Sequence, residues 1–183
     1  MKHIIRKAYW NYEKEEKWLN EMSSKGLAFT DYSWCRYVFE DATEGEYIYR
    51  IEFLDYPVKH PESKKYLSFL EETGVEIVAY YMRWVYLRKK ASEGNFDVYS
   101  DIDSKIKHYK KVNFWWSMLA GVEFGAALIN IAIGLIYLVL EGEVIFNLII
   151  GAILLIMGFL FLGLRRPLRK KIKKLKNERE IRE

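Results

Sequence analysis

The 183 residues include 29 Lys and Arg against 25 Asp and Glu, which gives a formal net charge of +4 at neutral pH. Residues 1–111 hold 19 basic and 19 acidic side chains, so this part lacks the basic surplus typical of nucleic-acid binding. The single cysteine, Cys35, excludes an internal disulfide and favours a reducing compartment.

The first part of the chain predicts two units of the same kind. A strand over 4–10 precedes a helix over 12–25, and short strands follow at 27–30 and 35–40. The same order then returns, with a strand at 47–54, a helix at 62–73, and strands at 75–80 and 84–89. We therefore expect an α+β domain over 1–98, built from two strand-helix-strand-strand repeats with an antiparallel sheet and helices on one face.

An internal alignment supports this repeat. Residues 18–39 align with 66–87 at an offset of 48 (66 minus 18), and each helix ends at a glycine suited to the left-handed position after a helix. The aligned pairs include Leu19 with Leu67, Met22 with Leu70, Gly26 with Gly74, Phe29 with Ile77, and Tyr32 with Tyr80. Chance similarity between two helix-glycine-strand units is the alternative.

The second part of the chain predicts a membrane hairpin. A linker helix at 99–111 leads into apolar runs at 112–140 and 144–164, which only three residues separate. The second run has 21 residues and would reach about 31 Å as a helix, close to the roughly 30 Å hydrocarbon layer. Two spans joined so tightly must be antiparallel.

Charge predicts the orientation of this hairpin. Basic residues flank it on both sides, and the tail at 165–183 has ten basic and three acidic residues. The expected location is the cell membrane, with two spans and with both termini in the cytoplasm. The tail residues expected to bind anionic lipid headgroups are Arg165, Arg166, Arg169, Lys170 and Lys171.

Within the spans, small and polar residues are candidates for helix contacts. Gly121 and Gly125 form a small-xxx-small pair, and Asn147, Gly151 and Gly158 share one face of the second helix. The hairpin can use one set and leave the other for self-association. Glu123 is an ionisable group near the inner boundary, with three possible roles: pairing with Arg165 or Arg166, contact with a partner membrane protein, or ion transfer.

Several stretches resemble one bacterial family. They are Tyr12–Met22, Lys25-Gly26, Arg36–Phe39, Gly45–Asp55, Tyr66–Gly74 and Trp84–Lys89. Over about residues 8–110 the chain is similar to domain of unknown function 2812 (DUF2812), with the membrane hairpin as the usual continuation. The resemblance implies a bacterial membrane protein in a regulatory or envelope-stress setting, since such proteins are often encoded beside PadR-type repressors. It implies no catalytic residue, because the family has no assigned activity.

Signatures of catalysis are not found in the sequence. The three histidines lie on separate predicted elements, so we expect no metal site, and neither a phosphate-binding glycine loop nor a nucleophile elbow occurs. We therefore expect a protein that is not an enzyme and needs no cofactor.

Aromatic side chains are the unusual feature of residues 1–98. They could line a site for an apolar or cationic ligand, although a plain hydrophobic core is the simpler interpretation. The candidate ligand-binding residues are Tyr47, Tyr49, Glu52, Tyr80 and Trp84. The leading hypothesis is a membrane-anchored regulator or sensor whose cytoplasmic domain binds a partner protein or small ligand. The alternative is an accessory or structural subunit of a larger membrane complex, recruited through Gly121, Glu123 and Gly125. A membrane-protein partner and a homo-oligomer are both possible assemblies.

Overall fold

The computed structural model describes residues 1–99, 101–141 and 145–182. The chain divides into two compact units, Met1–Ser100 and Asp101–Glu183, and each is described by itself. Most of the acidic connection predicted between the two apolar runs, including Gly142 and Glu143, lies outside the described residues.

The first unit contains the predicted repeat. Its elements, in chain order, are β1 (Lys2–Arg6), α1 (Tyr12–Ser23), β2 (Leu27–Ser33), β3 (Arg36–Asp41), β4 (Tyr47–Phe53), α2 (Pro61–Glu72), β5 (Glu76–Tyr81) and β6 (Trp84–Lys90). The first sheet has the order β1-β3-β2 and the second has the order β4-β6-β5, with every pairing antiparallel. The α+β fold class expected from the sequence is confirmed.

Matching irregularities show that the two copies share one geometry. The register between β2 and β3 shifts between Phe29 and Asp31, and that between β5 and β6 shifts between Ile77 and Ala79, 48 residues later. Gly26 and Gly74 both have a left-handed φ, of 76° and 83°, just after their helices. Both copies have a bulge, and both have a glycine that ends the helix, at the same offset of 48 residues. Chance similarity of short apolar segments does not explain these features.

Two cores result, one beside each helix. The first core joins α1 to the first sheet and to one face of the second sheet, through buried residues such as Leu19, Phe29 and Phe39. The second core joins α2 to the other face of the second sheet. Along β6 the side chains alternate, because Tyr86 enters the first core while Val85 and Leu87 enter the second.

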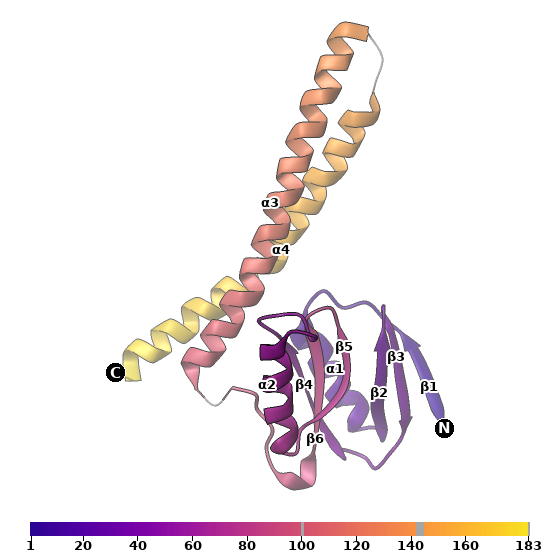
Figure 1. Cartoon of the computed structure of the whole chain (residues 1–183), viewed down its shortest axis with the longest axis vertical. Coiled ribbons are helices and arrows are strands. Elements are labelled where there is room, and N and C mark those ends of the chain that lie inside the picture. Colours follow the sequence, from indigo (N-terminus) through magenta and orange to yellow (C-terminus); the bar gives the residue numbers. More distant parts are fainter. Residues whose placement is uncertain (100, 142–144, 183) are drawn as a thin grey trace. The chain divides into compact units, whose positions relative to one another are not determined.

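The helices therefore do not cover one face of a single sheet. Figure 1 shows α1 between the two sheets and α2 on the outer side of the second one. The reason is that the second sheet is apolar on both faces, so each helix finds a separate apolar surface. The two sheets also contact each other directly, because the ring of Phe29 on β2 lies 5.4 Å from that of Tyr86 on β6.

The first strand is shorter than predicted, because it ends at Arg6 rather than Trp10. Its register with β3 stops at the pair Arg6–Arg36, where the β2–β3 turn begins. The ring of Tyr9 then packs against Trp18, with centroids 5.5 Å apart. Tyr9 continues the alternating pattern of the predicted strand in the sequence, but it belongs to the connection after β1, which turns into the core.

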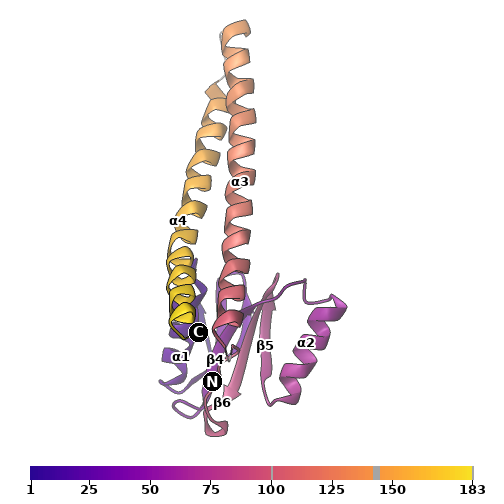
Figure 2. The same cartoon turned by 90° about the vertical axis from the view of Figure 1, so that its left-hand side faces the viewer.

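The second unit consists of α3 (Ile102–Glu141) and α4 (Ile145–Arg182). Figure 2 shows the two helices running side by side. Each has an apolar window with mean hydropathy of 2.0 in α3 and 2.5 in α4, and only 11% of each window is buried. Both are long and apolar enough to cross a membrane.

The polar ends of α3 and α4 also pack on each other. Arg179 forms an ion pair with Asp103 at 3.0 Å, and the Lys171 ammonium lies 5.6 Å from the ring centre of Tyr109. Leu168 is buried in this segment. Pro167 lies inside α4, and Figure 1 shows the helix changing direction between its orange and yellow parts, as expected where proline removes a backbone donor.

Candidate functional site

A buried carboxylate lies where the two repeats meet. Glu15 on α1 is only 7% exposed, and its Oε1 accepts hydrogen bonds from the Tyr37 hydroxyl at 2.6 Å and the Tyr86 hydroxyl at 2.7 Å. Tyr37 belongs to β3 of the first repeat and Tyr86 to β6 of the second. One carboxylate oxygen thus links both copies.

Burial controls the ionisation of this group. Loss of solvation raises the pKa of Glu15 above its ordinary value, and the two tyrosine hydrogen bonds partly oppose this rise. Burial and the neighbouring carboxylate also raise the pKa of Tyr37 and of Tyr86, so both remain hydroxyl donors. The arrangement resists placing a bare negative charge in the core and would favour a ligand that supplies positive charge.

Half-buried aromatic rings lie around this carboxylate. The ring of Tyr32 is 4.9 Å from Tyr37 and 5.0 Å from Tyr86, between centroids. The ring of Tyr12, one helical turn before Glu15, is 5.2 Å from Trp84. We call these residues the Glu15 cluster: Tyr12, Glu15, Tyr32, Tyr37, Trp84 and Tyr86. Rings around a carboxylate offer both cation–π attraction and a counter-charge.

The polar face of α1 holds this cluster in place by binding the edge of β4. The Asn20 side chain accepts from the backbone N–H of Tyr49 at 2.9 Å and donates to its carbonyl at 3.0 Å. The Ser23 hydroxyl donates to the Tyr47 carbonyl at 2.6 Å, and Glu16 accepts from the Ile51 N–H at 2.9 Å. Side chains of α1 thus bind the backbone of every other residue of β4, in the place that a neighbouring strand would take. They protect an otherwise open edge of the sheet.

The five residues predicted to bind ligand divide between two faces of the second sheet. Tyr47 and Trp84 pack against the first core, and Tyr49 is fully buried in it, with its hydroxyl accepting from the Phe29 N–H at 2.8 Å. Glu52 and Tyr80 both stand opposite Val85 in the register, so they belong to the other face.

Their surroundings differ as well. Glu52 is 3% exposed and accepts a hydrogen bond from the Tyr99 hydroxyl, whereas Tyr80 is 61% exposed. Glu52 is therefore not a solvated surface group, and it lies on the opposite face of the second sheet from Tyr49. Of the five, Trp84 alone belongs to the Glu15 cluster.

Glu15 was missed by sequence reasoning although a signal exists. Tyr12, Leu19 and Met22 define the inward stripe of α1, and Glu15 falls within that stripe at helical spacing. An acidic residue inside an apolar stripe is informative because carboxylates are seldom buried without partners.

In the second unit, the predicted small residues behave as two separate sets. A Cβ added at Gly151 would lie 2.6 Å from Ile131, and one at Gly158 would lie 2.7 Å from Phe124, so these glycines allow α4 to approach α3. Nothing lies within 4 Å of a Cβ at Gly121 or Gly125. Asn147, at helical spacing from Gly151, is half-buried.

The charged residues of this unit are placed as follows. Glu123 is half-buried and, within the described part of the chain, has no ion pair with Arg165 or Arg166. Among the predicted headgroup residues, three are exposed and two are half-buried. The exposed ones are Arg166, Arg169 and Lys170, and the half-buried ones are Arg165 and Lys171.

Histidines do not gather in the described structure. His3 contacts Asp41 at 2.7 Å, and His60 accepts from the Glu62 N–H at the start of α2. In residues 1–99, 101–141 and 145–182, no group of three or more His, Cys, Asp or Glu is arranged to hold a metal ion.

Together these features define a class: an α+β domain of two repeats, followed by two apolar helices that are long enough to span a membrane. The family model described as "Protein of unknown function (DUF2812)" matches residues 11–120. The chain belongs to this family, and the match runs from the N-cap of α1 into the first apolar part of α3. No curated protein and no solved structure matches the chain.

Proposed function

We propose that this protein is a non-enzymatic regulator or sensor, anchored in the cell membrane by α3 and α4 with both termini in the cytoplasm. The observation that carries the anchoring is the 11% burial of each apolar window. A core helix of a soluble protein buries most of its apolar surface, whereas these helices pack on each other and leave the rest uncovered. Lipid is the environment that such a surface requires.

The basic tail supports the orientation. Exposed Arg166, Arg169 and Lys170 directly follow the apolar part of α4, and anionic lipids of the cytoplasmic leaflet attract such side chains by about 1 kcal/mol each. The polar start of α3 pairs with this tail through Arg179 and Asp103, which would keep both ends on one side of the bilayer.

Membrane integration and orientation can be tested in one preparation. We expect the full-length protein to remain in the membrane fraction after alkaline carbonate extraction. In sealed right-side-out vesicles, we expect tags at both termini to resist protease until the membrane is opened. Release into the soluble fraction would contradict the anchoring, and cleavage of either tag in sealed vesicles would contradict the orientation.

For the soluble domain we propose binding of a small organic cation at the Glu15 cluster. The support is chemical: a carboxylate 7% exposed, held by two hydroxyls, among aromatic rings that are partly accessible. A cation that took the place of the tyrosine hydroxyls would keep the carboxylate satisfied and would stabilise its ionised form.

Tetraethylammonium is a suitable probe because it carries charge with little tendency to enter lipid. We expect it to bind the full-length protein, measured by calorimetry, more tightly as the pH rises through the elevated pKa of Glu15. Glu15→Gln should abolish binding, whereas Glu62→Gln, at an exposed position on the first turn of α2, should leave it unchanged. Equal binding to both variants would reject this site.

A second candidate function, as a subunit of a membrane complex, is favoured by two glycines of α3 that face open space in the described structure. Gly121 and Gly125 have open space around them, so a second membrane helix could approach there, as an accessory subunit or homo-oligomer would require. Gly125→Leu should then dissociate a complex isolated by crosslinking in native membranes, and Glu123→Gln should weaken it. Gly163→Leu is the control, since its surroundings are equally open. Unchanged assembly in Gly125→Leu would remove this alternative.

A further inference from the structure

We propose that one end of the soluble domain docks on the anionic lipid surface of the membrane. We call it the turn end. It comprises the connection after β1 (Arg6 to Trp10), the β2–β3 turn at Trp34 and Cys35, and the β5–β6 turn at Met82 and Arg83. This inference rests on the membrane anchoring proposed above and adds a contact that the anchoring does not require.

Large apolar side chains project from all three segments. Trp34 and Met82 are each 77% exposed, and Trp10 is 66% exposed. Trp34 and Met82 occupy equivalent turns, 48 residues apart, and both have a left-handed φ, of 29° and 57°. Turns of this conformation usually carry Asn, Asp or Gly, so bulky apolar residues here have no local advantage.

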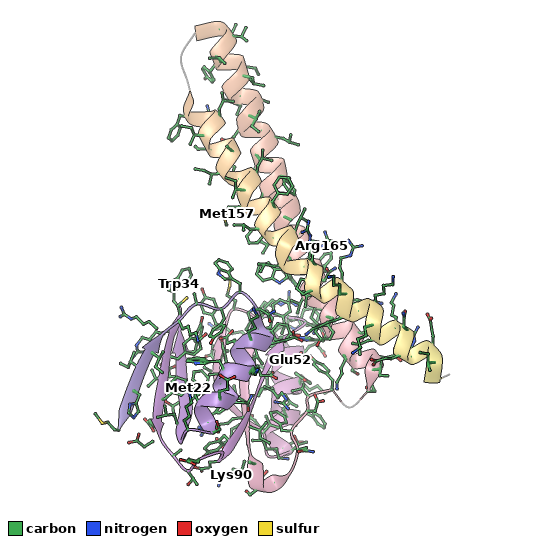
Figure 3. All side chains as sticks on the ribbon, turned by 180° about the vertical axis from the view of Figure 1, so that it is seen from behind. Met22, Trp34, Glu52, Lys90, Met157 and Arg165 are labelled. Carbon is green, nitrogen blue, oxygen red and sulfur yellow. The ribbon has the colours of Figure 1, made fainter. Side chains whose placement is uncertain are left out.

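The three residues lie at one end of the domain. The strand β1 ends at the Arg6–Arg36 pair beside the β2–β3 turn, and the rings of Trp34 and Tyr81 are 6.3 Å apart, which joins the two turns. Figure 3 shows Trp34 at the opposite end of the domain from Lys90. Trp10 precedes Tyr12, whose ring contacts Trp84 next to the β5–β6 turn.

The chain also leaves the domain at this end. After β6 it passes Phe96, whose ring lies 6.0 Å from the Arg50 guanidinium, and then Tyr99, which donates to Glu52. Because β4 runs from Tyr47 to Phe53 towards the turn end, this order of contacts leads the chain in the same direction. The helix α3 begins at Ile102, and its apolar run starts ten residues later, about 15 Å along a helix. That length allows the turn end to reach the lipid surface.

The turn end also carries exposed basic side chains, which are Arg6, Lys7 and Lys14. The far end carries both signs of charge, because Lys2, Lys25 and Lys90 are exposed there beside Asp41, Glu44 and Glu93. Anionic headgroups would attract the basic side chains of the turn end.

The physics of the interface fits these residues. Tryptophan favours the boundary between headgroups and acyl chains, and each basic residue near an anionic surface adds about 1 kcal/mol. Neither contribution holds a free domain on a membrane for long. The covalent connection to α3 would raise the effective lipid concentration, so weak contacts become sufficient.

Single-cysteine labelling of the full-length protein tests this contact. In a Cys35→Ser background, Ala8→Cys places a fluorophore at the turn end, and Thr43→Cys places one at the far end; both positions are exposed. The protein is reconstituted in phosphatidylcholine bilayers with and without phosphatidylglycerol, and a headgroup-labelled lipid serves as quencher. We expect strong quenching at residue 8 in anionic bilayers, weaker quenching in neutral ones, and little at residue 43.

A second pair of variants separates docking from simple proximity. Trp34→Ser with Met82→Ser should lower the quenching at residue 8 towards that at residue 43, whereas Phe69→Ser, which removes an exposed apolar group from α2, should not. Equal quenching at both ends, or quenching unaffected by lipid charge and by the double variant, would overturn the proposal. Carbonate extraction of the same samples shows separately whether the anchoring holds.

Discussion

The two repeats have one fold but different surroundings, and α1 and α2 show the contrast. On α1, Glu15 binds tyrosines of both copies, and Asn20 binds the strand backbone of the second copy. At the equivalent positions, 48 residues later, α2 has Ser63 and Ser68. Ser63 donates to the nearby Tyr56 carbonyl at 3.0 Å, and Ser68 is exposed. The two copies thus have the same fold, but the candidate site at Glu15 forms only on α1, where one copy packs on the other.

The core positions give the largest expected difference between the copies. Phe29 is fully buried and contacts rings of both repeats, including Tyr49 and Tyr86, whereas its equivalent Ile77 is half-buried. Phe29→Ala should lower the free energy of unfolding of the domain by about 3–5 kcal/mol, and Ile77→Ala by about 1–2 kcal/mol. Urea unfolding of the detergent-solubilised full-length protein, followed by near-ultraviolet circular dichroism, measures both. Equal losses would contradict the difference in burial between the two positions.

The edge of β4 gives the next largest effect. Asn20→Ala removes the partner of the Tyr49 N–H, whereas the Tyr49 carbonyl keeps its hydrogen bond from the Arg50 guanidinium at 2.9 Å. A backbone donor left unsatisfied costs about 1–3 kcal/mol if water does not replace the bond. We expect a loss of about 1–3 kcal/mol, and almost none for the equivalent Ser68→Ala. Hydrogen exchange adds a local readout, because the Tyr49 amide should lose protection in Asn20→Ala. Unchanged protection there would show that the side chain does not hold this edge.

Much of this fold is predictable from the sequence, because its signals are local. Helical apolar spacing, the glycines at 26 and 74, and alternation in β4 and β6 require only neighbouring residues. Two apolar runs with a short polar connection likewise predicted α3 and α4. Family membership followed from stretches that span the domain, and the match over 11–120 confirms it.

What escaped prediction depends on how distant segments pack. The place of α1 between two sheets follows from the second sheet being apolar on both faces, which no single strand reveals. The Glu15 cluster joins residues 71 positions apart, Glu15 and Tyr86, and therefore needs the tertiary arrangement. Strand alternation places Glu52 on the opposite face from Tyr49, but alternation could not tell which groups cover that face.

The glycines after the helices offer a finer comparison. Both need a left-handed φ, so Ala costs about 1–2 kcal/mol at either position. A Cβ at Gly26 would also lie 3.0 Å from the Ala42 carbonyl oxygen, a fixed backbone atom, whereas at Gly74 the near atom is Oε2 of the flexible Glu93. Gly26→Ala should therefore destabilise more than Gly74→Ala in the same urea experiment. The reverse order would indicate that the backbone of the β3–β4 loop shifts more easily than the Glu93 side chain after β6.

The smallest effect is the pH dependence that Glu15 contributes. Burial raises its folded-state pKa above the ordinary value of 4.5, so the folded state holds the proton more tightly than the unfolded one. This contribution to stability is complete below about pH 4.5 and is lost as the pH rises through the folded-state pKa. Glu15→Gln cannot ionise, so its stability relative to wild type should increase with pH across that window.

Two matched variants make this test specific to the cluster. Ser63→Ala, at the equivalent position of α2, removes one hydrogen bond of about 1 kcal/mol and no titrating group, so its difference from wild type should not vary with pH. Tyr37→Phe keeps the acid but removes a hydrogen bond that lowers its pKa, so the loss of stability should extend to higher pH. If Glu15→Gln instead gave a constant difference, the carboxylate would carry no pKa shift, and the proposed pH dependence of cation binding would lose its basis.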